Sequence, residues 1–432
     1  MNSKKLLVSG LCMAVVVSLS PVGANAEEKI APKTLEFLEA TTISGYVEAS
    51  YVYNIKPDVA NINERNGHPP GETSAADANH FRAFDNNVGF TLNAIKLVFE
   101  KPLGEGDWAA GYRADLIFGQ DATQLSRAEG TGSPNFDAAD TQGFGTYIEQ
   151  GYVSFRVPIG NGLDFKFGRF VALSGYEVIE SPANLNFSRG LLFTFADPLA
   201  HTGLLASYRF NDMFDAQVGV VNGWNTWVDD DSEPAVIGRV GIRNSSGNFS
   251  LGLSGFYGSA RTQDPAFPSS TTSGGTGKLS SSDRWFVDGV ANFKPTEKVL
   301  LGLEALYGDQ RLADENAGGD KWWGAAGYAK VQLTDKVHVA GRAEYLRDRL
   351  GVLFDDDRAG FDPNHEVDGK PVAVWEVTGT LGIDVWKNLL MRFEARYDQA
   401  TTTGAGIPNG GLTPFHPKQD QLTFSADAVY SF

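Results

Sequence analysis

Apolar and polar residues alternate along most of this 432-residue chain. A period of two gives a β-strand one apolar and one polar face. We count about sixteen such segments, an even number that fits a closed antiparallel barrel. The expected strands are 42–53, 88–100, 108–118, 144–157, 163–170, 201–210, 214–222, 235–244, 249–258, 285–294, 299–307, 322–333, 337–347, 373–385, 389–400 and 421–432.

The charges show which face of these strands meets water. In residues 389–398, apolar side chains alternate with the charged side chains of Arg392, Glu394, Arg396 and Asp398. A basic side chain on a lipid-facing strand surface costs roughly 2 to 4 kcal/mol at the bilayer midplane. A small soluble barrel would instead fill its interior with apolar side chains. About sixteen strands enclose more space than side chains can fill, so we expect a transmembrane barrel around an aqueous channel.

The connections between the expected strands alternate in length. Short links such as 102–107 and 158–162 alternate with long ones such as 54–87 and 119–143. Transmembrane barrels have short periplasmic turns and long extracellular loops. A soluble sandwich or propeller gives no reason for this alternation. The fold class that we predict is therefore all-β, a transmembrane antiparallel up-and-down barrel.

The last expected strand, 421–432, has an apolar face that ends at Phe432. It is similar to the terminal strand of bacterial outer-membrane barrels, whose final Phe is read by the barrel-assembly machinery. An amphipathic edge strand of a soluble sheet is the alternative. Two interfacial girdles are expected from aromatic residues near strand ends, namely Trp108, Tyr147, Phe210, Trp285, Phe293, Trp375, Tyr397 and Tyr430.

Residues 1–26 have the pattern of a signal peptide. Lys4 and Lys5 precede an apolar run, and Ala24-Asn-Ala26 supplies a cleavage site. The apolar run is shorter than the roughly 20 residues of a membrane-spanning helix, so a single membrane anchor is the weaker alternative. We predict cleavage after Ala26, a short periplasmic segment over 27–41, and the barrel over 42–432.

The formal net charge of −17 argues against a nucleic-acid partner. The only cysteine, Cys12, lies inside the predicted signal peptide, so no disulfide is expected in the mature chain. Residues 27–41 are too short for the plug domain of an energy-coupled receptor. The remaining expected partners are outer-membrane lipid, lipopolysaccharide and small hydrophilic solutes.

Several short segments resemble the OmpL-like β-barrel porin family. Residues 44–54 and 93–102 are similar to its first two strands, and the strongest similarity begins at Phe167-Gly-Arg-Phe170. It continues through Gly175-Tyr-Glu-Val178, Asn186-Phe-Ser-Arg189 and His201-Thr-Gly203. The resemblance implies a diffusion porin of a Gram-negative outer membrane, and it identifies no substrate.

Residues 171–200 form the third long connection, which in general porins folds into the lumen. We expect its charged residues Glu177, Glu180, Arg189 and Asp197 to constrict the channel and to face cations of the wall. The pore-lining cations expected from the alternation are Arg113, Arg156, Arg209, Arg239, Arg243, Arg342, Arg392, Arg396, Lys96, Lys166 and Lys330. Opposed acids and bases would create a transverse field. The alternatives are a loop over the barrel mouth without a role in selectivity and, for any single cation, a merely solvated wall residue.

We predict no metal, no cofactor and no catalytic residue. The acidic segments 229–231 and 355–357 could share Ca²⁺ or Mg²⁺ with anionic lipid headgroups, but solvated loop charge is the simpler interpretation. Gly274-Gly-Thr-Gly-Lys278 lacks the leading Gly and the final Ser or Thr of a phosphate-binding loop.

The function favoured by the sequence is passive diffusion of small hydrophilic solutes and ions through an outer-membrane porin. An outer-membrane barrel enzyme, a closed substrate-specific channel and a secreted soluble β-protein are the alternatives. The sequence leaves open the solute, anion or cation preference, the pore radius, and whether the barrel forms a homotrimer.

Overall fold

The structure is a computed structural model that describes residues 40–55, 84, 88–128, 145–229, 232–261, 281–311, 320–349, 353, 372–402 and 420–432. The chain divides into two units, Met1–Thr42 and Ile43–Phe432. The predicted signal peptide and nearly all of segment 27–41 lie outside the described residues, and the second unit holds the sheet.

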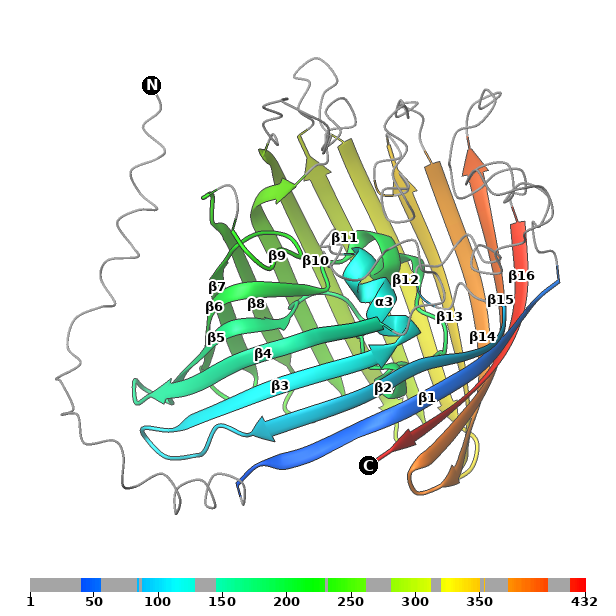
Figure 1. Cartoon of the computed structure of the whole chain (residues 1–432), viewed down its shortest axis with the longest axis horizontal. Helices are drawn as coiled ribbons and strands as arrows, with labels where there is room; N and C mark the ends of the chain where they lie inside the picture. The colour runs from blue at the N-terminus through cyan, green and yellow to red at the C-terminus, as the bar shows by residue number, and fades with distance from the viewer. Residues whose placement is uncertain are drawn as a thin grey trace. The chain divides into compact units, whose positions relative to one another are not determined.

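The described residues form sixteen antiparallel strands in one closed barrel, in which each strand pairs with its neighbours in sequence (Figure 1). The strands are β1 (Thr42–Asn54), β2 (Gly89–Lys101), β3 (Ala110–Gly119), β4 (Gly145–Val157), β5 (Leu163–Val171), β6 (Ala200–Arg209), β7 (Phe214–Val221), β8 (Ala235–Arg243), β9 (Phe249–Arg261), β10 (Ser281–Thr296), β11 (Val299–Gln310), β12 (Asp320–Gln332), β13 (Val337–Asp348), β14 (Val372–Trp386), β15 (Leu389–Thr402) and β16 (Asp420–Ser431). The predicted fold class is confirmed. The largest boundary error is at β10, which begins at Ser281 instead of Trp285.

The first and last strands close the barrel. Their register runs from Tyr46 opposite Ser431 to Asn54 opposite Thr423. Gly45 and Phe432 exchange two backbone hydrogen bonds of 3.0 Å. The sheet therefore has no free edge, and every strand finds backbone partners on both sides, as a spanning structure requires.

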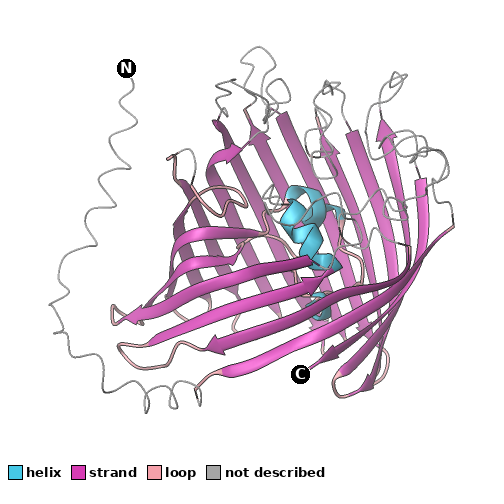
Figure 2. Ribbon diagram, viewed as in Figure 1, coloured by secondary structure: helices cyan, strands magenta, loops and turns pink. Residues whose placement is uncertain are grey.

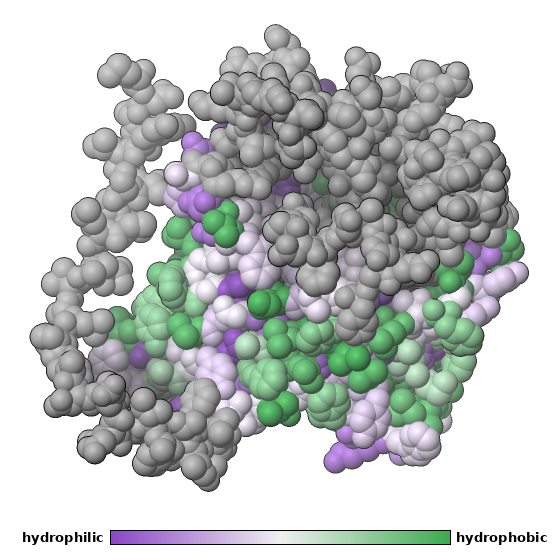
Figure 3. Space-filling model, in the orientation of Figure 1, coloured by the Kyte–Doolittle hydropathy of each residue, from purple (hydrophilic) through white to green (hydrophobic). Residues whose placement is uncertain are grey.

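Exposed and buried side chains alternate along the strands. The apolar side chains are the exposed ones and the charged side chains are buried, which is the reverse of a soluble protein. On β11, Leu303 is 64% exposed whereas the adjacent Glu304 is 3% exposed. On β14, Val377 is 50% exposed whereas Glu376 is fully buried. Hydrophobic side chains cover much of the described strand surface in view (Figure 3). The apolar face is thus the outer one, as the placement of the charges predicted. No helix among the described residues is long and apolar enough to cross a membrane.

Three strands break the simple alternation. In β2, the adjacent Asn93 and Ala94 are both buried. In β5, Gly168 has φ +133°, a value that suits glycine, and the strand changes phase before the buried Arg169. In β4, a register shift opposite Asp115 and Leu116 marks a bulge. The alternation of residue types in the sequence breaks at the first two positions, Asn93–Lys96 and Gly168-Arg169, but gives no sign of the bulge in β4.

Tyr147 is the one clear error in the predicted aromatic girdles. Its side chain is buried inside the barrel, where its hydroxyl accepts a hydrogen bond of 2.6 Å from Arg169. The predicted girdle residues Trp108, Phe210 and Trp285 are exposed, as expected. The bulge after Tyr147 explains the error, because a phase taken from one side of a bulge is wrong on the other.

One helix, α3 (Gln120–Ala128), lies within the ring of strands (Figures 1 and 2). It follows Gly119, whose φ of +111° turns the chain out of β3. Ala122 and Leu125 of this helix are fully buried in one cluster with Phe193 and Leu199 from the β5–β6 connection. The helix lies within 119–143, which the alternation of connection lengths predicts to be a loop.

The outer face can be tested at Leu303. We expect Leu303→Arg to lower the free energy of unfolding by roughly 2 to 4 kcal/mol relative to Leu303→Ala, because the cation would meet lipid. Urea titration of the barrel in lipid vesicles measures this difference. The control is Gln217→Arg on the inner face of β7, which should cost much less. Equal costs at the two positions would contradict the assignment of the faces.

Candidate channel constriction

Residues 172–199, here called the inner loop, connect β5 to β6 inside the barrel. The inner loop contains a 3-10 turn, η2 (Ser181–Ala183), and a π-helical turn, η3 (Leu192–Ala196). Leu191 and Leu192 are fully buried in one cluster with Trp322 and Leu346 from the inner faces of β12 and β13. Apolar packing against the wall therefore contributes to holding the loop in the lumen.

Arg342, on β13, joins the inner loop to the wall. One of its nitrogens, Nη1, lies 2.5 Å from Glu177 Oε1 and 2.6 Å from the carbonyl oxygen of Ser188. Its Nε donates to Glu376 on β14 at 2.7 Å. The side chain of Arg342 is fully buried, so this predicted wall cation neutralises carboxylates and is not solvated.

Arg392, on β15, binds a second part of the loop through its backbone. Its Nη1 donates to the carbonyl oxygens of Ser181, Asn184 and Asn186 at 3.0, 3.3 and 3.1 Å. Its Nη2 pairs with Asp427 on β16 at 2.9 Å and with Glu48 on β1 at 3.1 Å. A rigid guanidinium fork suits such a fully buried set of acceptors.

Two further contacts fasten the loop between these points. Glu394 accepts a hydrogen bond of 2.8 Å from the backbone N–H of Phe187. Arg396 donates to the carbonyl oxygen of Arg189 at 2.6 Å and to Asp398 at 2.7 Å. Polar contacts thus follow the loop from η2 to Arg189 along β1 and β13–β16.

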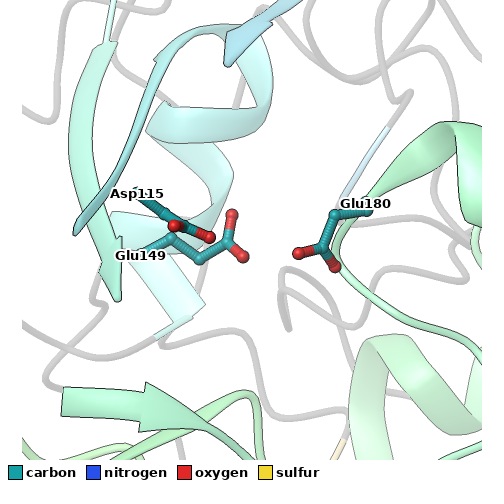
Figure 4. Close-up of side chains that lie close together, drawn as sticks. All are labelled: Asp115, Glu149 and Glu180. Atoms are coloured by element: carbon teal, nitrogen blue, oxygen red, sulfur yellow. The ribbon is translucent and has the colours of Figure 1, made fainter. Parts of the chain in front are cut away.

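Lys96, on β2 next to β1, continues this set of loop contacts around the wall. Its Nζ lies 2.8 Å from Glu180 in the loop, 2.8 Å from Glu149 on β4 and 3.3 Å from Asp115 on β3. Figure 4 shows Glu180 facing the two wall carboxylates. The three acids lie close enough together to hold a metal ion, but the Lys96 ammonium already supplies a positive charge among them.

The protonation of Glu180 depends on this contact. Burial alone would raise its pKa, but the Lys96 ammonium holds the pKa of Glu180 below its usual value. A depressed carboxyl pKa favours the docked loop above the ordinary pKa of the group. The contact weakens as the pH falls through the lowered pKa.

The side chains of the other two charged residues predicted in the loop contact groups other than wall cations. Arg189 donates to the carbonyl oxygen of Ile179 at 2.6 Å and lies 3.6 Å from Asp121 in α3. Asp197 is buried beside Glu304 of β11, which is a carboxylate. The expectation that Asp197 faces a cation is therefore wrong.

The predicted wall cations fall into two sets. The covered cations, Lys96, Arg342, Arg392 and Arg396, are buried beneath the loop. The open cations are Arg113, Arg156, Lys166, Arg209, Arg239, Arg243 and Lys330, on the inner faces of β3–β6, β8 and β12.

The open cations are partly exposed even where they are paired. Arg113 pairs with Asp115 at 2.8 Å, and Arg156 pairs with Asp164 at 2.6 Å, with the two arginines 25% and 24% exposed. Arg239 and Arg243 both pair with Asp215, and Arg209 pairs with Asp212. Lys166 lies over the Tyr152 ring.

The carboxylates that neutralise the covered cations were not named as site residues from the sequence. They are Glu48, Asp115, Glu149, Glu376, Asp398 and Asp427. The same alternation that identified the cations also places most of them on the inner face, so that signal could have found them.

The family model described as putative beta-barrel porin-2, OmpL-like, matches residues 40–432. The chain belongs to this family. The match spans every strand of the barrel, and it confirms the resemblance seen in the short segments. As a member of this porin family, the chain is an outer-membrane channel protein of Gram-negative type, and its apolar outer face is the lipid-facing one.

Solved porins share the fold at low identity. The outer-membrane channel DcaP of Acinetobacter baumannii is 12% identical, with a TM-score of 0.54 over 91% of this chain and 97% of that one. OmpT of Vibrio cholerae is 10% identical, with a TM-score of 0.55 and the same coverage. An anion-selective porin from Comamonas acidovorans is 12% identical, with a TM-score of 0.54 over 91% and 99%. A comparison with curated proteins finds no match.

The acidic segments proposed for divalent ions lie almost wholly outside the described residues. Of 229–231, only Asp229 is described, and one of its carboxylate oxygens accepts a hydrogen bond of 2.8 Å from the backbone N–H of Ser232. Segment 355–357 is not among the described residues.

The covered and open cations should differ in their contribution to stability. We expect Arg342→Met to lower the free energy of unfolding by about 3 to 5 kcal/mol, because Glu177 and Glu376 would lose their buried counter-charge. The matched control, Arg209→Met, removes an exposed pair and should cost at most about 1 kcal/mol. Urea unfolding in vesicles measures both, and similar costs would contradict the division into two sets.

Proposed function

We propose that this porin is a water-filled channel for passive diffusion of small hydrophilic solutes and ions, with the inner loop as its constriction. The observation that carries the proposal is the course of the inner loop. It is held by Lys96 on β2 and by Arg342 and Arg392 on β13 and β15. The loop begins at the end of β5 and reaches β13, which lies opposite β5 in the ring of sixteen strands, so the loop crosses the lumen and narrows the passage.

The exposed fractions of the wall cations support the assignment of one part of the wall to the aqueous path. Arg342 and Arg392 have fully buried side chains, whereas the side chains of Arg239 and Arg243 are 30% and 50% exposed. The exposed cations lie near the short turns, as Arg156 does at the end of β4 and Arg243 at the end of β8. We infer that solutes pass along the inner faces of β3–β8. This path lies on the side of the inner loop that faces the short turns.

The charges along this path favour anions. The seven open cations exceed the described carboxylates that pair with them, which are Glu100, Asp115, Asp164, Asp212 and Asp215. Rings of basic side chains in a pore favour anions. Salt screens exposed charges over about 10 Å at 0.1 M, so the preference should be strongest at low ionic strength.

The outer partners follow from the same architecture. Outer-membrane lipid and lipopolysaccharide are the proposed surroundings of the apolar outer face. The barrel-assembly machinery is the proposed partner of β16 through Phe432, whose side chain is 49% exposed. A closed substrate-specific channel is the second candidate function, because the loop covers the wall cations of β13 and β15 completely.

Electrical recording tests these proposals. We expect the purified protein to give stable ohmic steps in a planar bilayer, with a reversal potential of the sign for anions under a salt gradient. Lys166→Gln should shift that potential toward cation preference. The charge-matched control is Lys321→Gln, because Lys321 pairs with Asp309 on the outer face.

Two results would count against the proposals. Silence from folded, inserted protein would reject passive diffusion and favour the closed channel. An equal shift with Lys321→Gln would show that the potential reports total charge and not the inner wall.

A further inference from the structure

Asp197 and Glu304 form a buried carboxyl pair between the inner loop and β11. Asp197 directly follows η3, and its backbone N–H donates a hydrogen bond of 3.0 Å to the carbonyl oxygen of Leu192. Asp197 is 4% exposed and Glu304 is 3% exposed. The two carboxyl groups lie within hydrogen-bonding reach of each other. Among the described residues, no N–H or O–H donor reaches either Asp197 oxygen or Glu304 Oε1.

The groups around the pair on each packed element are mostly acidic. Asp288 of β10 accepts a hydrogen bond of 2.9 Å from Gly175. Tyr328 of β12 donates to Glu304 at 3.2 Å and to Glu344 of β13 at 3.0 Å. The inner loop itself adds two titratable groups, Tyr176, whose ring stacks on that of Tyr328, and Glu177.

Arg342 is a basic group close to Tyr328 and Glu344 of this cluster, and it is already engaged with Glu177 and Glu376. Two buried carboxylates in one place cannot both ionise without a compensating charge. The pair must therefore hold either a proton or a bound cation. A hydrogen bond between two carboxyl groups requires one of them to be protonated, because an ionised carboxylate has no donor.

We propose that Asp197 and Glu304 share one proton, and that this proton fastens the inner loop to β11. Loss of the proton places two negative charges against each other and against Asp288 and Glu344. The C-terminal part of the inner loop then leaves the wall. The attachment of the inner loop to β11 through this pair therefore depends on pH.

The direction of the pH effect follows from linkage. Burial first, and then the charges of Glu304 and Asp288, raise the pKa of Asp197 well above its usual value. A raised carboxyl pKa favours the docked loop below the ordinary pKa, and this contribution is lost as the pH rises through the raised value. Glu180 acts in the opposite direction at acid pH, so its contact cannot produce a release at alkaline pH.

The test measures how readily a buried position in the loop becomes accessible. Thr194→Cys, in η3, places a thiol at a position that is 5% exposed, and Ser246→Cys on an exposed short turn is the reference. Both are made in a Cys12→Ser background. The rate of alkylation by a charged maleimide is measured from about pH 5 to about pH 9, and the ratio of the two rates removes the effect of thiol ionisation.

We expect this ratio to rise by about tenfold or more as the pH rises. Asp197→Asn should make it nearly independent of pH, because the amide donates to Glu304 without a titrating proton. Glu304→Gln is a second variant with the same expectation if Asp197→Asn fails to fold. The matched control Asp215→Asn, on the open wall, should leave the rise unchanged.

Three outcomes would overturn the proposal. The first is a ratio of alkylation rates that does not change with pH in the parent protein. The second is a rise of this ratio with pH that persists in both Asp197→Asn and Glu304→Gln. The third is a ratio that changes on addition of Ca²⁺ or EDTA at constant pH. The last would mean that a cation and not a proton neutralises the pair. The assay does not require conduction, so its failure is distinguishable from failure of the proposed channel function.

Discussion

The burial of charge inside the barrel is the constraint on which the rest of the structure depends. Lipid outside forces the charged face of every strand inward, where isolated charges would be costly unless water or a counter-charge reaches them. On β13–β16 and β1 the inner loop excludes water, and each covered arginine has carboxylate partners such as Glu376 or Asp427. The open cations on β3–β8 stay partly exposed, so water reaches them as well as their carboxylate partners.

The sequence predicted the barrel well because its signal is local. Alternation assigns a face to each residue without knowledge of its partners, and it fails only at local irregularities such as the bulge at Glu149. The helix α3 was missed because its apolar residues, Ala122 and Leu125, are too few to stand out in a polar segment. They become a buried face only when the inner loop packs on them.

The candidate site was predicted less completely, because it depends on which charges meet. Alternation placed Arg342 and Arg392 on the inner wall, but it cannot state that Glu177 meets the first or that loop carbonyl oxygens meet the second. Asp197 shows the limit most clearly. Its acidic type suggested a basic partner, whereas the course of the chain brings it to Glu304.

The pairing of Gly45 with Phe432 also bears on how the barrel assembles. These two residues come from the first and last strands, so the contact has the longest sequence separation that the sheet contains. Chain entropy opposes such a contact until the intervening strands are in place, and non-local pairing slows folding. The seam between β1 and β16 should therefore be the last part of the sheet to form, after the inner loop is already enclosed.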